Sequence, residues 1–220
     1  MKLLRPLRER DFALLWTGLT VSLIGDGIFL VALAWQVYDI ENDPVALSLV
    51  GTAWTLGMVA FLLTGGLVSD RAERRRVIIA ADLVRAAALV AIGILSLDGS
   101  LQIWHLVAAA ALIGVCEAFF GPAFGALVPE LVRPEHLVQA NALDQLVRPA
   151  ALRLAGPAVG GGLVAGLGVG AAFMLDAATF LLSAACVAAM SVRALPASDV
   201  ARSARREMRE GLAYVRRQPW

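Results

Sequence analysis

The sequence predicts an all-α integral membrane protein with six transmembrane helices. The composition is 59% hydrophobic and 17% charged over 220 residues, with a mean hydropathy of +0.74. A soluble domain of this size has no core large enough for so much apolar surface. Six apolar stretches are each long enough to cross ~30 Å of hydrocarbon at ~1.5 Å per residue. The third observation is that the basic residues gather in alternate connectors.

The expected spans are separated by short connectors that leave no room for a soluble catalytic domain. We place the spans at residues 12–37, 45–69, 77–97, 103–128, 141–166 and 169–191. Residues 1–11 are expected to form a cytoplasmic N-terminus, and residues 192–220 a cytoplasmic linker.

The basic residues predict the orientation. Of the nineteen Lys and Arg residues, four precede the first span, four lie between the second and third, one lies between the fourth and fifth, and seven follow the sixth. The remaining three lie inside spans. This positive-inside pattern places both chain ends in the cytoplasm of a multi-pass protein of the cell inner (plasma) membrane. The formal net charge of +1 gives no indication of a nucleic-acid partner.

Residue patterns of soluble enzymes are absent from the sequence. There is no G-x-x-x-x-G-K-[ST] loop for nucleotide phosphates, no H-E-x-x-H and no G-x-S-x-G. Cys116 and Cys186 both fall inside spans, at a spacing that matches no metal-ligand framework. We therefore expect no enzyme activity, no cofactor and no metal site. Energy for transport would come from an ion gradient or from a separate ATPase.

The connector between the second and third spans is the most informative segment. With its flank it has the sequence GLVSDRAERRR, and it resembles the G-x-x-x-D-[RK]-x-G-x-[RK]-[RK] motif of the major facilitator superfamily. The matching residues are Gly66, Asp70, Arg71, Arg75 and Arg76. A small residue at Gly66 would let a neighbouring helix approach closely, and Asp70 would accept hydrogen bonds from arginines or a helix N-terminus.

The alternative for this segment is an ordinary basic cytoplasmic loop. That alternative accounts for the arginines but not for the spacing of Gly66, Asp70 and Arg71. The motif's second glycine is Glu73 here, and a side chain at that place can alter how tightly the loop turns.

The fifth span carries a second resemblance. Its sequence GPAVGG resembles the end of the G-P-x-x-G-G motif of drug antiporters, with matches at Gly156, Pro157, Gly160 and Gly161. Proline removes a backbone donor and bends the helix, and glycines permit close packing against a partner helix. The alternative is plain helix packing by a longer stripe of small residues, since the upstream glycines of the full motif are missing.

The order of segments resembles the macrolide and enterobactin exporters of the same superfamily. The stretches that carry this resemblance are SLIGDGIF, DLVRA, GPAFGALVPELV, QANALDQLVRPAALRLAGPAVGG and REGLAYVRRQPW. The resemblance implies that this chain is the N-terminal half of a transporter whose C-terminal six-helix half is absent from it. Residues 203–220 would form an amphipathic helix leading to the missing seventh span. It also implies a small amphipathic substrate of the drug or siderophore type.

Charged residues inside the spans are the candidates for chemistry, because an ionised group at membrane depth costs ~2.5–3.5 kcal/mol or more. Asp26 and Glu117 lie near the middle of the first and fourth spans, which line the central cavity in the family. Both become candidates for proton coupling or for binding a cationic group, together with Arg153. These acids and bases could instead simply neutralise each other. Asp82 with Arg85, Asp176 and Arg148 are expected to be structural.

The function that follows is proton-coupled export of a small amphipathic compound. The alternative is a six-helix membrane subunit that works with a separate partner such as an ATPase, and an intramembrane enzyme is a third, for which no plausible nucleophile and base are present. Since family members move one half against the other, we expect that this chain alone does not transport.

Overall fold

The computed structural model describes residues 4–191, and over this range it consists of helices and short connections. The order is η1 (Arg5–Arg8), α1 (Arg10–Ile40), α2 (Pro44–Arg71), α3 (Arg74–Leu97), α4 (Ile103–Leu131), η2 (Pro134–His136), α5 (Leu137–Ala150), η3 (Ala151–Ala155), α6 (Gly156–Leu167) and α7 (Val169–Ala188). Within this described range, six helical stretches are long and apolar enough to cross a membrane. The predicted all-α membrane fold is confirmed. The amphipathic helix expected at 203–220 lies outside the described residues.

The helix ends follow local sequence signals. Asp43 caps α2 by accepting a hydrogen bond from the Val45 N–H at 2.9 Å, with Pro44 at the first helical position. Gly168 separates α6 from α7 with φ +83°, a backbone conformation that favours glycine. Most helices extend a few residues beyond the expected spans into their connectors.

The fifth span is built from three helical pieces rather than one. The π-helix η3 joins α5 to α6, and the Gly156 N–H bonds to the Ala151 carbonyl, five residues earlier. Pro157 lacks an N–H, and in an α-helix its ring would collide with the carbonyl of Arg153. The wider π turn just before Pro157 relieves that conflict, so the expected bend takes the form of a π insertion.

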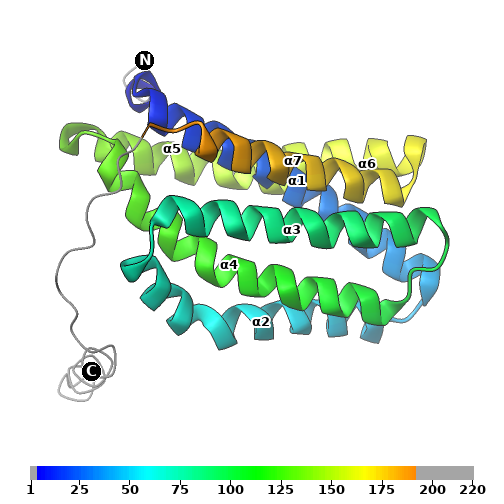
Figure 1. Cartoon of the computed structure of the whole chain (residues 1–220). Helices are drawn as coiled ribbons and strands as arrows, with labels where there is room; N and C mark the ends of the chain where they lie inside the picture. Colours follow the sequence, from blue (N-terminus) through cyan, green and yellow to red (C-terminus); the bar gives the residue numbers. More distant parts are fainter. Residues whose placement is uncertain (1–3, 192–220) are drawn as a thin grey trace, which may run out of the picture.

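The helices are arranged around α3 and α7. Figure 1 shows α3 in the middle, with α7 and α1 on one side and α4 and α2 on the other. The strongest contacts join α2 to α4, α4 to α3, α3 to α7, α7 to α1, and α1 to η3 and α6. If the first, second and third spans are exchanged with the fourth, fifth and sixth, the same list of contacts results. This is the pattern of nested inverted repeats. Consequently α2 and the fifth span lie at the two ends of the row and are largely exposed.

The ends of the helices sort into two groups. Figure 1 places the N-terminus, the α2 to α3 connection, the start of α5 and the end of α7 at one end of the bundle. The connections that carry arginine are all at this end, and we refer to it as the basic end.

Candidate functional site

A cluster of charged side chains lies near the middle of the spans. Arg85 of α3 is 3% exposed, and its Nη2 donates to Glu117 Oε2 of α4 at 2.6 Å. Its Nη1 lies 3.9 Å from Asp82 Oδ1, one turn earlier on α3. The guanidinium carbon is 4.9 Å from the Phe120 ring centre and 5.2 Å from that of Phe180. Arg85 thus lies between two acids and beside two aromatic rings.

The inner side of this cluster is formed by α3 and α7. Asp82 is fully buried, and its Oδ2 accepts a hydrogen bond from the Ser183 hydroxyl at 2.7 Å. Asp176, also buried, accepts from the Thr179 hydroxyl at 3.1 Å. Polar groups at this depth are costly unless they are paired. The bond between Ser183 and Asp82 joins α7 to α3 in addition to their packing, whereas the bond between Thr179 and Asp176 lies within α7.

Asp26 joins the cluster from α1. It is half-buried, and it interacts electrostatically with Arg85, Glu117, Asp82 and, more weakly, Arg148. Its neighbour Gly25 allows α1 to lie directly on α7, since a Cβ there would come within 2.2 Å of both Asp176 Oδ1 and Thr179 Oγ1. This close approach brings the α1 carboxyl to the acids of the other helices.

Glu117 is the member of the cluster that reaches outward. Its side chain is 36% exposed, whereas that of Arg85 is 4% and that of Asp82 is 0%. The cluster therefore has a closed side on α3 and α7 and an open side at Glu117.

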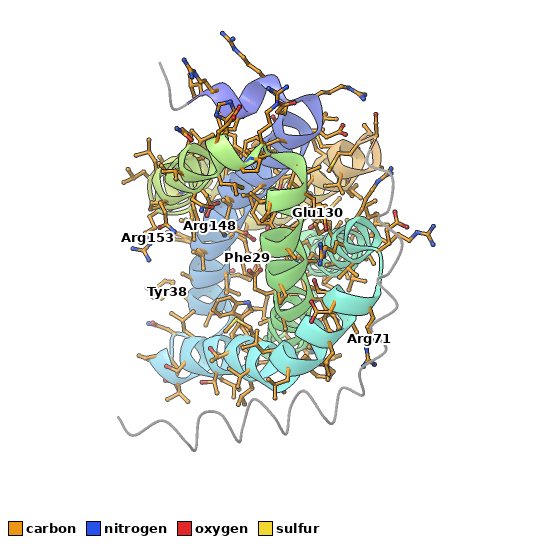
Figure 2. The ribbon with its side chains drawn as sticks, turned by 90° about the vertical axis from the view of Figure 1, so that its left-hand side faces the viewer. Phe29, Tyr38, Arg71, Glu130, Arg148 and Arg153 are labelled. Atoms are coloured by element: carbon orange, nitrogen blue, oxygen red, sulfur yellow. The ribbon has the colours of Figure 1, made fainter. Side chains whose placement is uncertain are left out.

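Arg153, a candidate from the sequence, does not join this cluster. It is exposed on the π turn of the fifth span, and Figure 2 shows it pointing away from the other helices. The arginine that pairs with the acids of this cluster is Arg85 instead. The i, i+3 spacing of Asp82 and Arg85 correctly indicated a pair, but nothing in the sequence showed that Arg85 also reaches Glu117 across to α4.

The motif between α2 and α3 forms a second charged group at the basic end. Arg74 pairs with Glu130 at the end of α4, and Arg76 pairs with Glu73 at 2.5 Å. Arg75 donates to the last carbonyls of α7, with its Nε 3.0 Å from the Val187 oxygen. Arg74 and Arg75 thus join the start of α3 to the ends of α4 and α7.

The other two charged residues of this motif lie at its surface. Asp70 and Arg71 are both exposed, and Figure 2 shows Arg71 at the margin of the molecule. Both therefore lie on the surface of the bundle at the basic end.

The close helix approach expected at Gly66 occurs one residue earlier. A Cβ at Gly65 would come within 2.0 Å of the Ala118 carbonyl oxygen on α4, whereas a Cβ at Gly66 would meet nothing within 4 Å. Gly57 and Gly114 continue the same tight contact between α2 and α4. Gly66 therefore has no packing role in this conformation.

The glycines of the fifth span also divide into two kinds. A Cβ at Gly156 would lie 2.6 Å from both Gly27 Cα and the Ile24 oxygen, and one at Gly160 would lie 3.0 Å from Ile28 Cα. A Cβ at Gly161 would meet nothing within 4 Å. The Gly-Pro segment is thus a contact between the fifth span and α1, close to Asp26.

A cavity of about 340 Å³ opens between α1, α4 and α5. Its wall includes Phe12, Trp16, Phe124 and the ion pair of Asp144 with Arg148, whose atoms approach to 3.3 Å. The Trp16 indole N–H is buried without a hydrogen-bond partner. Within residues 4–191 no group of His, Cys, Asp and Glu has the arrangement of a metal site.

The comparisons with known proteins agree with this architecture. Residues 2–219 match the family model MFS_3, described as transmembrane secretion effector. Among curated relatives, the uncharacterized MFS-type transporter YfiS of Bacillus subtilis is 24% identical over 98% of this chain and 52% of its own length. Macrolide efflux protein A of Streptococcus pyogenes is 27% identical, over 93% of this chain and 51% of its own length. Multidrug efflux pump Tap of Mycolicibacterium fortuitum is 30% identical, over 84% and 46%.

The chain spans about half the length of the curated relatives it matches. No solved structure matches it. The family and these relatives are membrane transporters, not enzymes, and the family model covers nearly the whole chain. The chain is therefore a multi-pass membrane protein that belongs to the transmembrane secretion effector family of the major facilitator superfamily.

Proposed function

We propose that this chain provides one six-helix half of a secondary transporter that exports a small amphipathic compound, of the drug or siderophore type, in exchange for protons. The names of two relatives, a macrolide efflux protein and a multidrug efflux pump, support the direction and the class of substrate. The position of Glu117 carries the proposal, because this carboxyl is held by the buried Arg85 and still reaches the open side of the bundle.

An exchanger needs a group that holds either a proton or the substrate, but not both. A carboxylate meets this need, since a proton and a cationic substrate group neutralise it in alternation. Glu117 on α4 and Asp26 on α1 are the acids that we assign to this exchange. Substrate would bind while these acids are ionised, and protonation would then release it.

A second six-helix half is part of the proposal. Glu117 is partly exposed and Arg153 is exposed, and charged groups at membrane depth need water or protein against them rather than lipid. Family members move one half against the other around a shared site. The gathering of arginine-bearing connections at the basic end supports an orientation with both chain ends in the cytoplasm of the plasma membrane.

The experiment is a flux measurement in lipid vesicles with an imposed proton gradient and ethidium as the probe. The full product of the gene should move ethidium against its gradient, and Glu117→Gln or Asp26→Asn should each reduce this flux to the leak of protein-free vesicles. Asp39→Asn is the matched control, because Asp39 is an exposed carboxylate at the end of α1 that lies away from the basic end. Equal loss in all three variants would refute a specific role for Asp26 and Glu117.

The same vesicles test the partner. The 220-residue chain alone should show no flux above the leak, and gradient-driven flux from it would overturn the need for a second half. Flux that required an added ATPase and ATP but no gradient would instead establish the alternative of a six-helix subunit with a separate ATPase. The family match argues against that alternative.

A further inference from the structure

Arg85 is placed between two acids and engages them unequally. Its Nη2 is 2.6 Å from Glu117 Oε2, a full charge-assisted hydrogen bond, but its Nη1 is 3.9 Å from Asp82 Oδ1, which is too long for one. Asp82 Oδ1 and Arg85 Nε are both buried without a hydrogen-bond partner. An arginine donor and a carboxylate acceptor on the same turn of α3 are thus both left unsatisfied.

The distances leave the guanidinium a short path between its two acids. Its central carbon lies 4.9 Å from the Phe120 ring centre and 5.2 Å from that of Phe180, so these side chains occupy space beside it. The two carboxylates lie 2.6 and 3.9 Å from its two terminal nitrogens. A shift of about 1 Å toward Asp82 would bring that pair to hydrogen-bond distance and away from Glu117.

We propose that Arg85 is a positioning residue with two alternative partners, bound to Glu117 while that acid is ionised and transferred to Asp82 when Glu117 is neutralised. A buried guanidinium without an ionised partner is strongly unfavourable, so neutralising one acid drives it to the next. Asp82 is the nearest such acid, and Ser183 already holds its other oxygen in place. The remaining charged groups that act on Arg85 are Asp26 on α1 and Asp176 on α7.

The transfer would connect the open side of the cluster to the closed one. Occupation of Glu117 by a proton or a cationic group would tighten the bond of Arg85 to Asp82, and through Ser183 the contact of α3 with α7. Its use in transport rests on the proposed function, whereas the transfer itself does not. Magnetic resonance on the chain therefore tests the transfer of Arg85, and flux measurements on the transporter separately test the proposed function.

The test follows the Arg85 guanidinium directly. The full chain is labelled with ¹⁵N-arginine and placed in lipid nanodiscs, and the Arg85 Nε–H signal is identified by its loss in Arg85→Lys. Glu117→Gln mimics the neutral acid and should displace this signal. The Arg148 signal is the internal control, because Arg148 pairs with Asp144 on its own helix and should stay in place in every variant.

The decisive comparison concerns Asp82. Asp82→Asn should displace the Arg85 signal several-fold more in the Glu117→Gln background than in the wild type, where Glu117 holds the guanidinium. Equal displacement in the two backgrounds would overturn the proposal, as would an Arg85 signal that does not respond to Glu117→Gln. Glu117→Asp serves if Glu117→Gln fails to fold, because it keeps the charge, shortens the arm and should shift the signal part of the way.

Discussion

Two parts of the bundle carry an arginine near mid-span, and they place it in opposite environments. On α3, Arg85 is 3% exposed and bound to Glu117. On the fifth span, Arg153 is exposed and forms no ion pair with another residue of the described range. The charge of the α3 side chain is paired within this half, whereas the fifth-span side chain needs water or protein from elsewhere. An arginine inside a span therefore marks either internal pairing or an outward-facing surface, and the neighbouring helices decide which.

The largest expected effect separates these two arginines. Arg85→Met would leave Glu117 and Asp82 without their cation, and breaking a buried pair in this way costs about 3–5 kcal/mol. Arg153→Met removes no described pair and should not lower the free energy of unfolding. Unfolding in mixed micelles titrated with sodium dodecyl sulfate measures both. A similar loss in the two variants would show that the contrast between the two regions is wrong.

The second effect concerns how the fifth span contacts α1. Gly156→Ala would place a Cβ 2.6 Å from backbone atoms of α1, and overpacking of this kind costs about 1–3 kcal/mol. Gly161→Ala adds the same methyl where nothing lies within 4 Å, and alanine favours helix over glycine by up to about 1 kcal/mol. The two changes should thus have opposite signs in the same unfolding titration. A loss of stability at Gly161 would mean that this glycine packs as tightly as Gly156.

A smaller effect is expected within the α3 and α7 layer. Ser183→Ala removes the hydrogen bond to Asp82, and such bonds between membrane helices contribute about 0.6 kcal/mol on average and at most about 1.7. Ser48→Ala is the matched control, because the Ser48 hydroxyl bonds only to the Pro44 carbonyl on its own exposed helix. Its effect on the free energy of unfolding should be smaller. Equal effects would show that the bond between Ser183 and Asp82 adds nothing to the layer.

The sequence predicted the number of helices better than it predicted which side of each helix contacts protein. Six long apolar stretches can satisfy their backbone in lipid only as helices, so their number followed from hydropathy. Their contacts did not, because a helix that is apolar on all sides gives no pattern to distinguish lipid from protein. Gly65 and Gly66 are adjacent and chemically identical, but only the first touches α4. The sequence showed both Arg85 and Arg153 as arginines inside spans. Which of them pairs with Glu117 depends on which helix lies beside each, and the sequence did not show that.

The smallest expected effect on stability is at Asp70, where the effect on transport should be large. Asp70 is exposed at the end of α2, outside both regions, so Asp70→Asn should change the free energy of unfolding by no more than about 0.5 kcal/mol. The amide keeps the size of the carboxylate but loses the charge that would bind arginines or a helix N-terminus of a second half. Ethidium flux by the full gene product should therefore fall several-fold while membrane insertion is unchanged. Glu73→Gln is the control, because Glu73 already pairs with Arg76 inside this half. Unchanged flux in Asp70→Asn would remove the conformational role of the motif, and the α2 to α3 connection would then be an ordinary basic loop.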